Sequence, residues 1–215
     1  MNATLVVLAG LSVGTYQWKL LEERADTIMP MIMKTYSFRR DLRERPMIVQ
    51  QRKNLGAYEP TAIPMYYKYL RDNPVTPMNW VVVALSERIG GHSKLFLPFA
   101  MKYLAESLTQ ANALAFIRKH GGAAEANSVA AILLEEDFLT KDPRLVFKCL
   151  HTIGGPDVLA VIQQYALLQI ARNPDGYWVE NANMCRNAIE LRLKAEEMGL
   201  IHTPYRYAPE PWRTK

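Results

Sequence analysis

Cysteine is scarce in this chain of 215 residues, and the residue patterns typical of common catalytic and metal sites are missing. The two cysteines, Cys149 and Cys185, have no neighbouring cysteine, which excludes a disulfide framework and a zinc site built from CxxC pairs. The four histidines show neither HxH nor HExxH spacing, and the chain has no GxSxG or P-loop sequence. We therefore expect no catalytic residue, no cofactor and no metal ion, and a protein that is not an enzyme.

The balance of charged and apolar residues is that of a globular protein. Hydrophobic residues make up 49% of the chain and charged residues 22%, which excludes the disordered and collagen-like classes. Lysine and arginine number 26 against 21 acidic residues, so the net charge is +5. A chain of this length can bury a sizeable core without disulfide bonds.

Charge is absent from residues 1–18, which are rich in apolar side chains. A transmembrane helix needs about 20 mostly apolar residues, so this segment lies at the short end of the range. Tyr16 and Trp18 lie where an aromatic belt would form, and the basic residues that follow would keep the rest of the chain on the cytoplasmic or matrix side. We predict that residues 1–18 form a membrane anchor. Its residues are Leu5, Val6, Val7, Leu8, Gly10, Leu11, Val13, Gly14 and Trp18.

Three other interpretations of residues 1–18 stay open. A secretory signal peptide normally begins with basic residues, and this segment has none. Thr4–Val7 has the β-branched character of a buried strand, with Gly10 as a turn, and a buried helix is the remaining alternative. Gly10 and Gly14 form a GxxxG pair, which lends weak support to helix packing in a membrane.

Residues 19–92 are predicted to form a basic region punctuated by proline. Pro46, Pro60, Pro64, Pro74 and Pro77 predict an irregular path with one short helix at residues 65–70. Basic side chains gather between residues 34 and 53, and we expect them to contact an anionic partner. These side chains are Lys34, Arg39, Arg40, Arg43, Arg45, Arg52 and Lys53.

The nature of that anionic partner is left open by the sequence. Arginines interleaved with Tyr36, Phe38 and Tyr58 could contact phosphates and stack on bases of RNA or DNA. The same side chains could meet anionic lipid head groups beside a membrane anchor. A solvated or protein-binding surface is the simplest alternative.

Residues 93–200 are predicted to form a helical body, because apolar residues recur at helical spacing and the breaks fall at glycine and proline. Glycine pairs occur at residues 90–91, 121–122 and 154–155, and their spacing is almost even. A helical hairpin has this length, so an array of hairpins is predicted, although no residue signature of a named repeat is present. The expected helices cover residues 94–108, 111–120, 123–137, 143–152, 156–172 and 178–198.

Residues 201–215 are predicted to form an extended tail. Three prolines exclude a helix of any length, and the aromatic side chains are poorly suited to open water. We expect Tyr205, Tyr207 and Trp212 to bind a partner protein.

Taken together, the sequence predicts a mainly α protein: an irregular helical-hairpin array with an N-terminal hydrophobic segment and an extended C-terminal tail. The expected function is that of a non-catalytic accessory or scaffold subunit of a membrane-associated complex, acting through contacts with other protein subunits and with anionic lipid. The expected location is the mitochondrial inner membrane, with the body on the matrix side. The alternative is a soluble component of a ribonucleoprotein or similar assembly that binds RNA or DNA.

Overall fold

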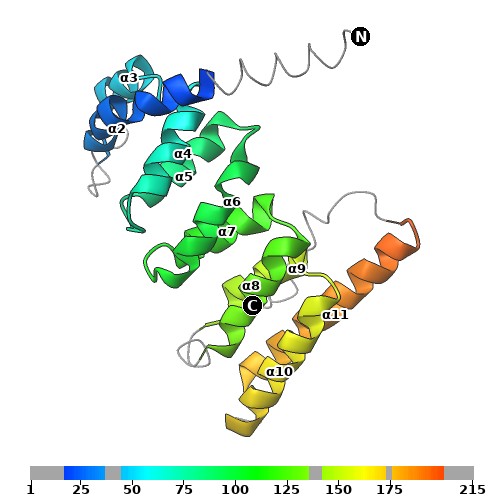
Figure 1. Ribbon diagram of the computed structural model, residues 1–215. Helices are drawn as coiled ribbons and strands as arrows, with labels where there is room; N and C mark the ends of the chain where they lie inside the picture. Colours follow the sequence, from blue (N-terminus) through cyan, green and yellow to red (C-terminus); the bar gives the residue numbers. More distant parts are fainter. Residues whose placement is uncertain (1–16, 37–44, 136–141, 173–175, 201–215) are drawn as a thin grey trace, which may run out of the picture. The chain divides into compact units, whose positions relative to one another are not determined.

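The computed structural model describes residues 17–36, 45–135, 142–172 and 176–200. These residues are mainly helical, as the sequence predicts, and contain no strand. The chain divides into two compact units, Met1–Glu106 and Ser107–Lys215. This boundary follows Glu106, whereas the sequence predicts one between residues 92 and 93. Figure 1 labels the helices.

The first unit, Met1–Glu106, is far more helical than predicted. The prolines that suggested an irregular path instead mark the starts of helices and the turns between them: Pro46 opens a helix, and Pro74 precedes one. A proline in the first helical turn is tolerated because its missing N–H has no partner there in any case. Residues 17–23 are also helical. The further helices are α2 (Ala25–Lys34), α3 (Pro46–Asn54), α4 (Ala62–Asp72) and α5 (Trp80–Ile89).

The predicted helix over residues 94–108 is divided into three pieces. A 3₁₀ turn, η2 (Ser93–Phe96), leads into α6 (Leu97–Lys102), which is followed by a second turn, η3 (Tyr103–Ala105). Pro98 explains the first division, because a proline inside a longer helix would clash with the carbonyl four residues before it. The helical path ends at Glu106, whose backbone is extended.

Aromatic side chains fill the core of the first unit. The Tyr67 ring meets Phe99 edge to face at 5.2 Å between centroids and Phe96 at 6.4 Å. Trp80 meets Tyr103 in the same manner at 5.2 Å. These contacts join α4 and α5 to the short helices that follow them, and α2 packs on α4.

The second unit, Ser107–Lys215, follows the predicted helices closely. The structure shortens the helix predicted over residues 123–137, because a 3₁₀ turn, η4 (Ile132–Leu134), replaces its last described part. The other helix positions agree with the sequence to within one residue at both ends. The helices are α7 (Gln110–His120), α8 (Ala123–Ala131), α9 (Arg144–Ile153), α10 (Asp157–Arg172) and α11 (Tyr177–Glu197).

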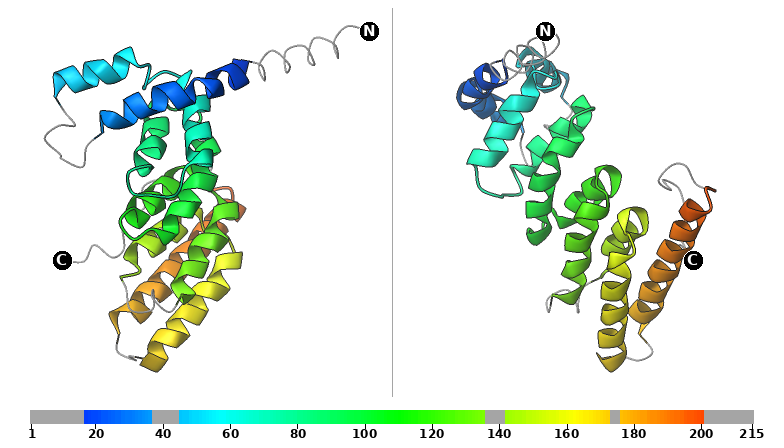
Figure 2. Two further views of the ribbon diagram at one scale, coloured as in Figure 1. Left: turned by 60° about the vertical axis from the view of Figure 1, so that its left-hand side comes forward. Right: turned by 45° about the vertical axis from the view of Figure 1, so that its right-hand side comes forward.

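In the second unit, helices α9 and α11 each pack on the two helices that precede them. Helix α9 contacts α7 and α8, and α11 contacts α9 and α10. Helix α8 also contacts α10. The two views of Figure 2 show α10 and α11 lying side by side along their lengths.

Two of the three glycine pairs have the same structural role. Gly121 and Gly154 end α7 and α9, and each donates its N–H to the carbonyl four residues earlier at 2.7 Å. A Cβ on Gly154 would lie 2.5 Å from the Leu150 carbonyl oxygen, and one on Gly121 would lie 2.7 Å from that of Ile117. These contacts are too close for any other residue. The third pair differs, because Gly90 and Gly91 have φ of +76° and +68°.

The buried residues of α7 and α9 repeat at the interval that separates Gly121 from Gly154. Each buried position of α7 has a buried counterpart in α9 at this interval. Helices α7 and α9 therefore share one register of buried positions. The matches are Ala113 with Val146, Leu114 with Phe147, Phe116 with Cys149, and Ile117 with Leu150.

Candidate partner-binding surfaces

The basic residues predicted to contact an anionic partner have different surroundings. Lys34 at the end of α2, Arg45 before α3 and Lys53 near the end of α3 are exposed. Their side chains are therefore accessible to a partner. Arg39, Arg40 and Arg43 lie outside the described residues.

Arg52, also predicted to contact an anionic partner, is buried and bonded within the first unit. Its side chain is only 3% exposed. Its Nη2 donates to the Thr35 carbonyl oxygen at 2.6 Å, and its Nε donates to the Thr35 Oγ1 at 3.0 Å. Thr35 caps the C-terminal end of α2, where free carbonyl oxygens carry partial negative charge. Arg52 thus joins α3 to the end of α2.

Tyr36 completes this buried arrangement. The Arg52 guanidinium lies over the Tyr36 ring, 3.7 Å from its centroid. Burial raises the pKa of Tyr36 well above its usual value, while the positive charge of Arg52 opposes that rise. The sequence suggested that these arginine and aromatic side chains could contact RNA or DNA. In the structure, Arg52 and Tyr36 stack on each other within the protein.

Trp18 contacts the body of the first unit. Its ring is half-buried and meets Tyr67 of α4 edge to face at 6.2 Å. Within the part of the chain that the structure describes, no helix combines the length and the apolar character needed to cross a membrane. The other predicted anchor residues, from Leu5 to Gly14, lie outside the described residues.

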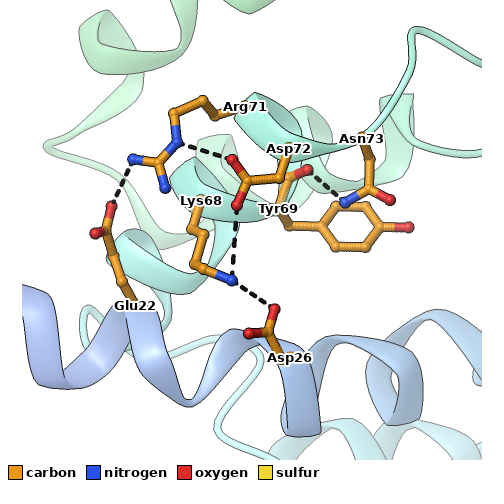
Figure 3. A network of polar contacts seen from close by, with 7 residues as sticks. All are labelled: Glu22, Asp26, Lys68, Tyr69, Arg71, Asp72 and Asn73. Carbon is orange, nitrogen blue, oxygen red and sulfur yellow. Dashed lines mark hydrogen bonds and ion pairs between the residues drawn. The ribbon is translucent and has the colours of Figure 1, made fainter.

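A network of ion pairs connects the N-terminal helices to the C-terminal end of α4 (Figure 3). Lys68 pairs with Asp26 of α2 and with Asp72 one turn later, at 3.6 Å. Arg71 pairs with Asp72 at 2.9 Å and with Glu22 at 3.3 Å. Several of these side chains are largely exposed, and Asp26 is 77% exposed. Exposed ion pairs of this kind contribute little to the free energy of unfolding, so the main effect of the network is on the orientation of α4.

The two cysteines, Cys149 and Cys185, are both buried. Burial raises the pKa of both Cys149 and Cys185 to about 12, so neither thiol ionises near neutral pH. His120 stacks on Phe116 at 4.7 Å between ring centroids. Over the described ranges, no three His, Cys, Asp or Glu side chains are placed to hold a metal ion.

Helix α10 carries an exposed face without charge. The side chains of Ala160, Gln164, Leu167, Leu168 and Ala171 are all exposed, and Leu167 is 57% exposed. No charged residue occurs between Asp157 and Arg172. A solvent-facing helix surface normally carries charged residues, so this surface is suited to contact with protein.

The sequence does not reveal this surface. Apolar spacing in the sequence traces one face of a helix through Val158, Val161, Ile162, Tyr165, Leu168 and Ala171 or Arg172. In the structure Val158, Ile162 and Tyr165 are buried, whereas Leu168, Ala171 and Arg172 are exposed. The buried face instead continues through Ala166 and Gln169. The only sign of the exposed face in the sequence is the long interval without charged residues. A fully buried helix would show the same interval, so this sign does not distinguish the two.

The predicted partner-binding tail, Tyr205, Tyr207 and Trp212, lies outside the described residues. Comparison with known proteins gives no family: no family model, no curated protein and no solved structure matches this chain.

Proposed function

We propose that this protein is a non-catalytic accessory or scaffold subunit that acts through contacts with other proteins of a larger assembly. The observation that carries the proposal is the shared register of α7 and α9, whose C-terminal glycines and buried positions repeat at one interval. Arrays of helical hairpins stack their units into a continuous core and present long surfaces to partner proteins. In this proposal the second unit is such an array, with α11 as the first helix of a further hairpin.

The charge-free face of α10 supports the same proposal. Leu167 and Leu168 occupy exposed positions on a helix whose opposite side is buried in the unit. Contact with another protein would remove these side chains from water, at roughly 25 cal/mol for each Å² of apolar surface buried.

The proposal includes attachment to a membrane through residues 1–18, with the body on the matrix side of the mitochondrial inner membrane and anionic lipid as a further partner. This part depends on the uncharged N-terminal segment and on the exposed Lys34, Arg45 and Lys53. Membrane attachment stays a prediction from the sequence.

Extraction of the native protein followed by sizing tests the proposal. We expect high salt and alkaline carbonate to leave the protein in the membrane fraction, and mild detergent to release it in a complex much larger than a dimer of the chain. Release as a monomer or dimer alone would refute the role as a subunit. Release by salt alone would refute the membrane anchor, and loss of the complex after nuclease treatment would favour the nucleic-acid alternative.

A further inference from the structure

Contacts within the second unit cover the side of α10 opposite its exposed face and one of its two flanks. Val158, Ile162 and Tyr165 are buried on the opposite side of the helix. Gln163 accepts a hydrogen bond from Arg186 of α11, which places α11 along one flank. Ile170, on the same flank as Gln163, is 43% exposed. Between this flank and the opposite edge lie Ala160, Gln164, Leu167, Leu168 and Ala171, which are all exposed and which we call the open face. Their spacings of three and four residues place them on one side of a helix.

The open face carries the small Ala160 before Gln164 and the large Leu167 and Leu168 after it, with Ala171 at its C-terminal end. Ala160 and the half-buried Val161 lie in its first half, and Leu167 and Leu168 lie in its second half. Gln164 stands between them, near the midpoint of the helix. A surface with this gradient fits a copy of itself that runs in the opposite direction, because large side chains then meet small ones.

The charges at the two ends of α10 also favour a partner helix that runs in the opposite direction. Asp157 begins α10 and Arg172 ends it, and the helix between them makes about four turns. Both side chains therefore lie toward the side of Leu168, at the edge of the open face. Both are exposed, and neither forms an ion pair with any described residue. In an antiparallel pair of α10 helices, Asp157 of each copy would lie beside Arg172 of the other.

We propose that the open face of α10 binds the same face of a second copy of this chain, in an antiparallel pair with the two-fold axis at Gln164. Leu167 and Leu168 of one copy pack on Ala160 and Val161 of the other. The two Gln164 side chains meet at the axis, where each amide donates to and accepts from its equivalent. A two-fold interface requires this kind of self-complementary surface.

Size, hydrogen bonding and charge all favour the antiparallel arrangement over a parallel one. A parallel pair would place leucine against leucine, leave space at the alanines, and bring like charges together at both ends. One helix pair forms a small interface, so we expect a reversible dimer rather than a permanent one. This dimer does not depend on the proposed role in a larger complex, and the masses of the two species distinguish them.

Sedimentation equilibrium of the purified full-length protein in mild detergent tests the dimer directly. The chain has a mass of 24.5 kDa, and we expect a concentration-dependent species of twice that mass. Leu167→Glu should raise the dissociation constant at least tenfold, because it places two buried carboxylates in the interface. Met47→Glu is the matched control, since Met47 is an exposed apolar residue of the first unit, at 77%, and should leave the dimer unchanged. A mass of one chain at every concentration would overturn the proposal, and so would a dimer that tolerates Leu167→Glu.

Exchange of the terminal charges separates an interface effect from a folding effect. Asp157→Arg and Arg172→Asp should each weaken the dimer, because each brings like charges together across the interface. The double variant should restore it, since the two charges are then exchanged on both copies. A purely structural effect predicts the opposite, because each change is unfavourable to the α10 macrodipole and the double variant would be the least stable. Failure of the double variant to recover dimerisation would therefore overturn the proposed pairing.

A cysteine at the two-fold axis gives a second independent test. Gln164→Cys should form an intermolecular disulfide under mild oxidation, because the two residues meet at the axis. Asn187→Cys on α11 is the control, since Asn187 is also exposed but lies outside the open face. Equal cross-linking of the two variants would show that collisions, not the proposed pairing, bring the thiols together.

Discussion

The two units of this protein hold their helices together in different ways. In the first unit, polar side chains join successive elements: Arg52 donates to the Thr35 carbonyl oxygen, Tyr66 donates to the Ala57 carbonyl oxygen at 2.5 Å, and Tyr69 donates to Asn79 Oδ1 at 3.0 Å. In the second unit, glycine corners let consecutive helices turn sharply, and apolar residues at equivalent positions fill the core. The first unit should therefore be sensitive to the loss of polar groups, and the second to added volume.

The largest effect is expected at the glycine corner between α9 and α10. Gly154→Ala places a Cβ 2.5 Å from the Leu150 carbonyl oxygen and 2.9 Å from Val158 Cγ2, so the helices must move apart. We expect a loss of about 3 kcal/mol in the free energy of unfolding of the second unit, measured by chemical denaturation. Gly155→Ala is the adjacent control, because nothing lies within 4 Å of a Cβ there, and it should cost about 0.5 kcal/mol or less. Equal losses in the free energy of unfolding for the two variants would show that the close contacts of Gly154 are not the cause.

A smaller loss is expected when the buried cation of the first unit is removed. Arg52→Met leaves the carbonyl oxygen and hydroxyl of Thr35 without this donor, and should lower the free energy of unfolding by about 2 kcal/mol. Lys53→Met changes an exposed charge on the same helix and should have an effect of about 0.5 kcal/mol or less. Denaturation midpoints compare the two variants. If Arg52→Met left stability unchanged but abolished binding to nucleic acid or lipid vesicles, Arg52 would be a ligand contact after all.

The stability of the second unit should fall in mild acid because of His151. Burial, together with the nearby positive charge of Arg192, lowers the pKa of His151 below its ordinary value of 6.5. The unfolded chain therefore binds a proton more readily than the folded one, so stability is complete above about pH 6.5 and declines as the pH falls below it. Thermal denaturation between pH 5 and 8 measures this decline. His151→Gln should flatten the profile, and an unchanged slope would assign the acid sensitivity to another group.

The smallest effect is expected in the ion-pair network of Figure 3. Asp26→Asn removes one of the two carboxylate partners of Lys68, but Asp26 is 77% exposed and the pair competes with water and salt. We expect a denaturation midpoint indistinguishable from that of the parent protein at physiological ionic strength. The network would be important for the stability of the first unit if Asp26→Asn clearly lowered the denaturation midpoint and if high salt lowered the midpoint of the parent protein by a similar amount.

The sequence predicts helices well where their ends carry local signals. The glycine pairs lie at the ends of α7 and α9, and at the start of α9 Asp142 accepts a hydrogen bond from the Arg144 N–H at 3.0 Å. In the first unit, the prolines gave a wrong prediction, because a proline that opens a helix and one that breaks a helix look alike without knowledge of the helix boundaries. Pro46 and Pro98 are both of the first kind.

The candidate surfaces were harder to predict, because burial is decided by packing between distant residues. Arg52 and Lys53 are adjacent basic residues in the sequence, yet only Lys53 is exposed, because the helical rotation directs Arg52 toward Thr35. Leu168 and Tyr165 lie one turn apart and share apolar character, yet only Tyr165 is buried. Hydrophobic periodicity identifies a helix face without showing whether a neighbour in the same chain covers it.

The bond between Arg52 and Thr35 has a consequence for how the chain tolerates changes in length. It closes a loop across 17 residues, and this loop includes Arg39, Arg40 and Arg43. The entropy of closing a flexible loop grows only with the logarithm of its length, so doubling the loop costs about 0.6 kcal/mol. Added residues between Tyr36 and Arg45 should therefore cost little, because α3 begins only at Pro46 and Arg52 keeps its position on that helix. An insertion within α3 should instead turn Arg52 away from Thr35 and break the bond.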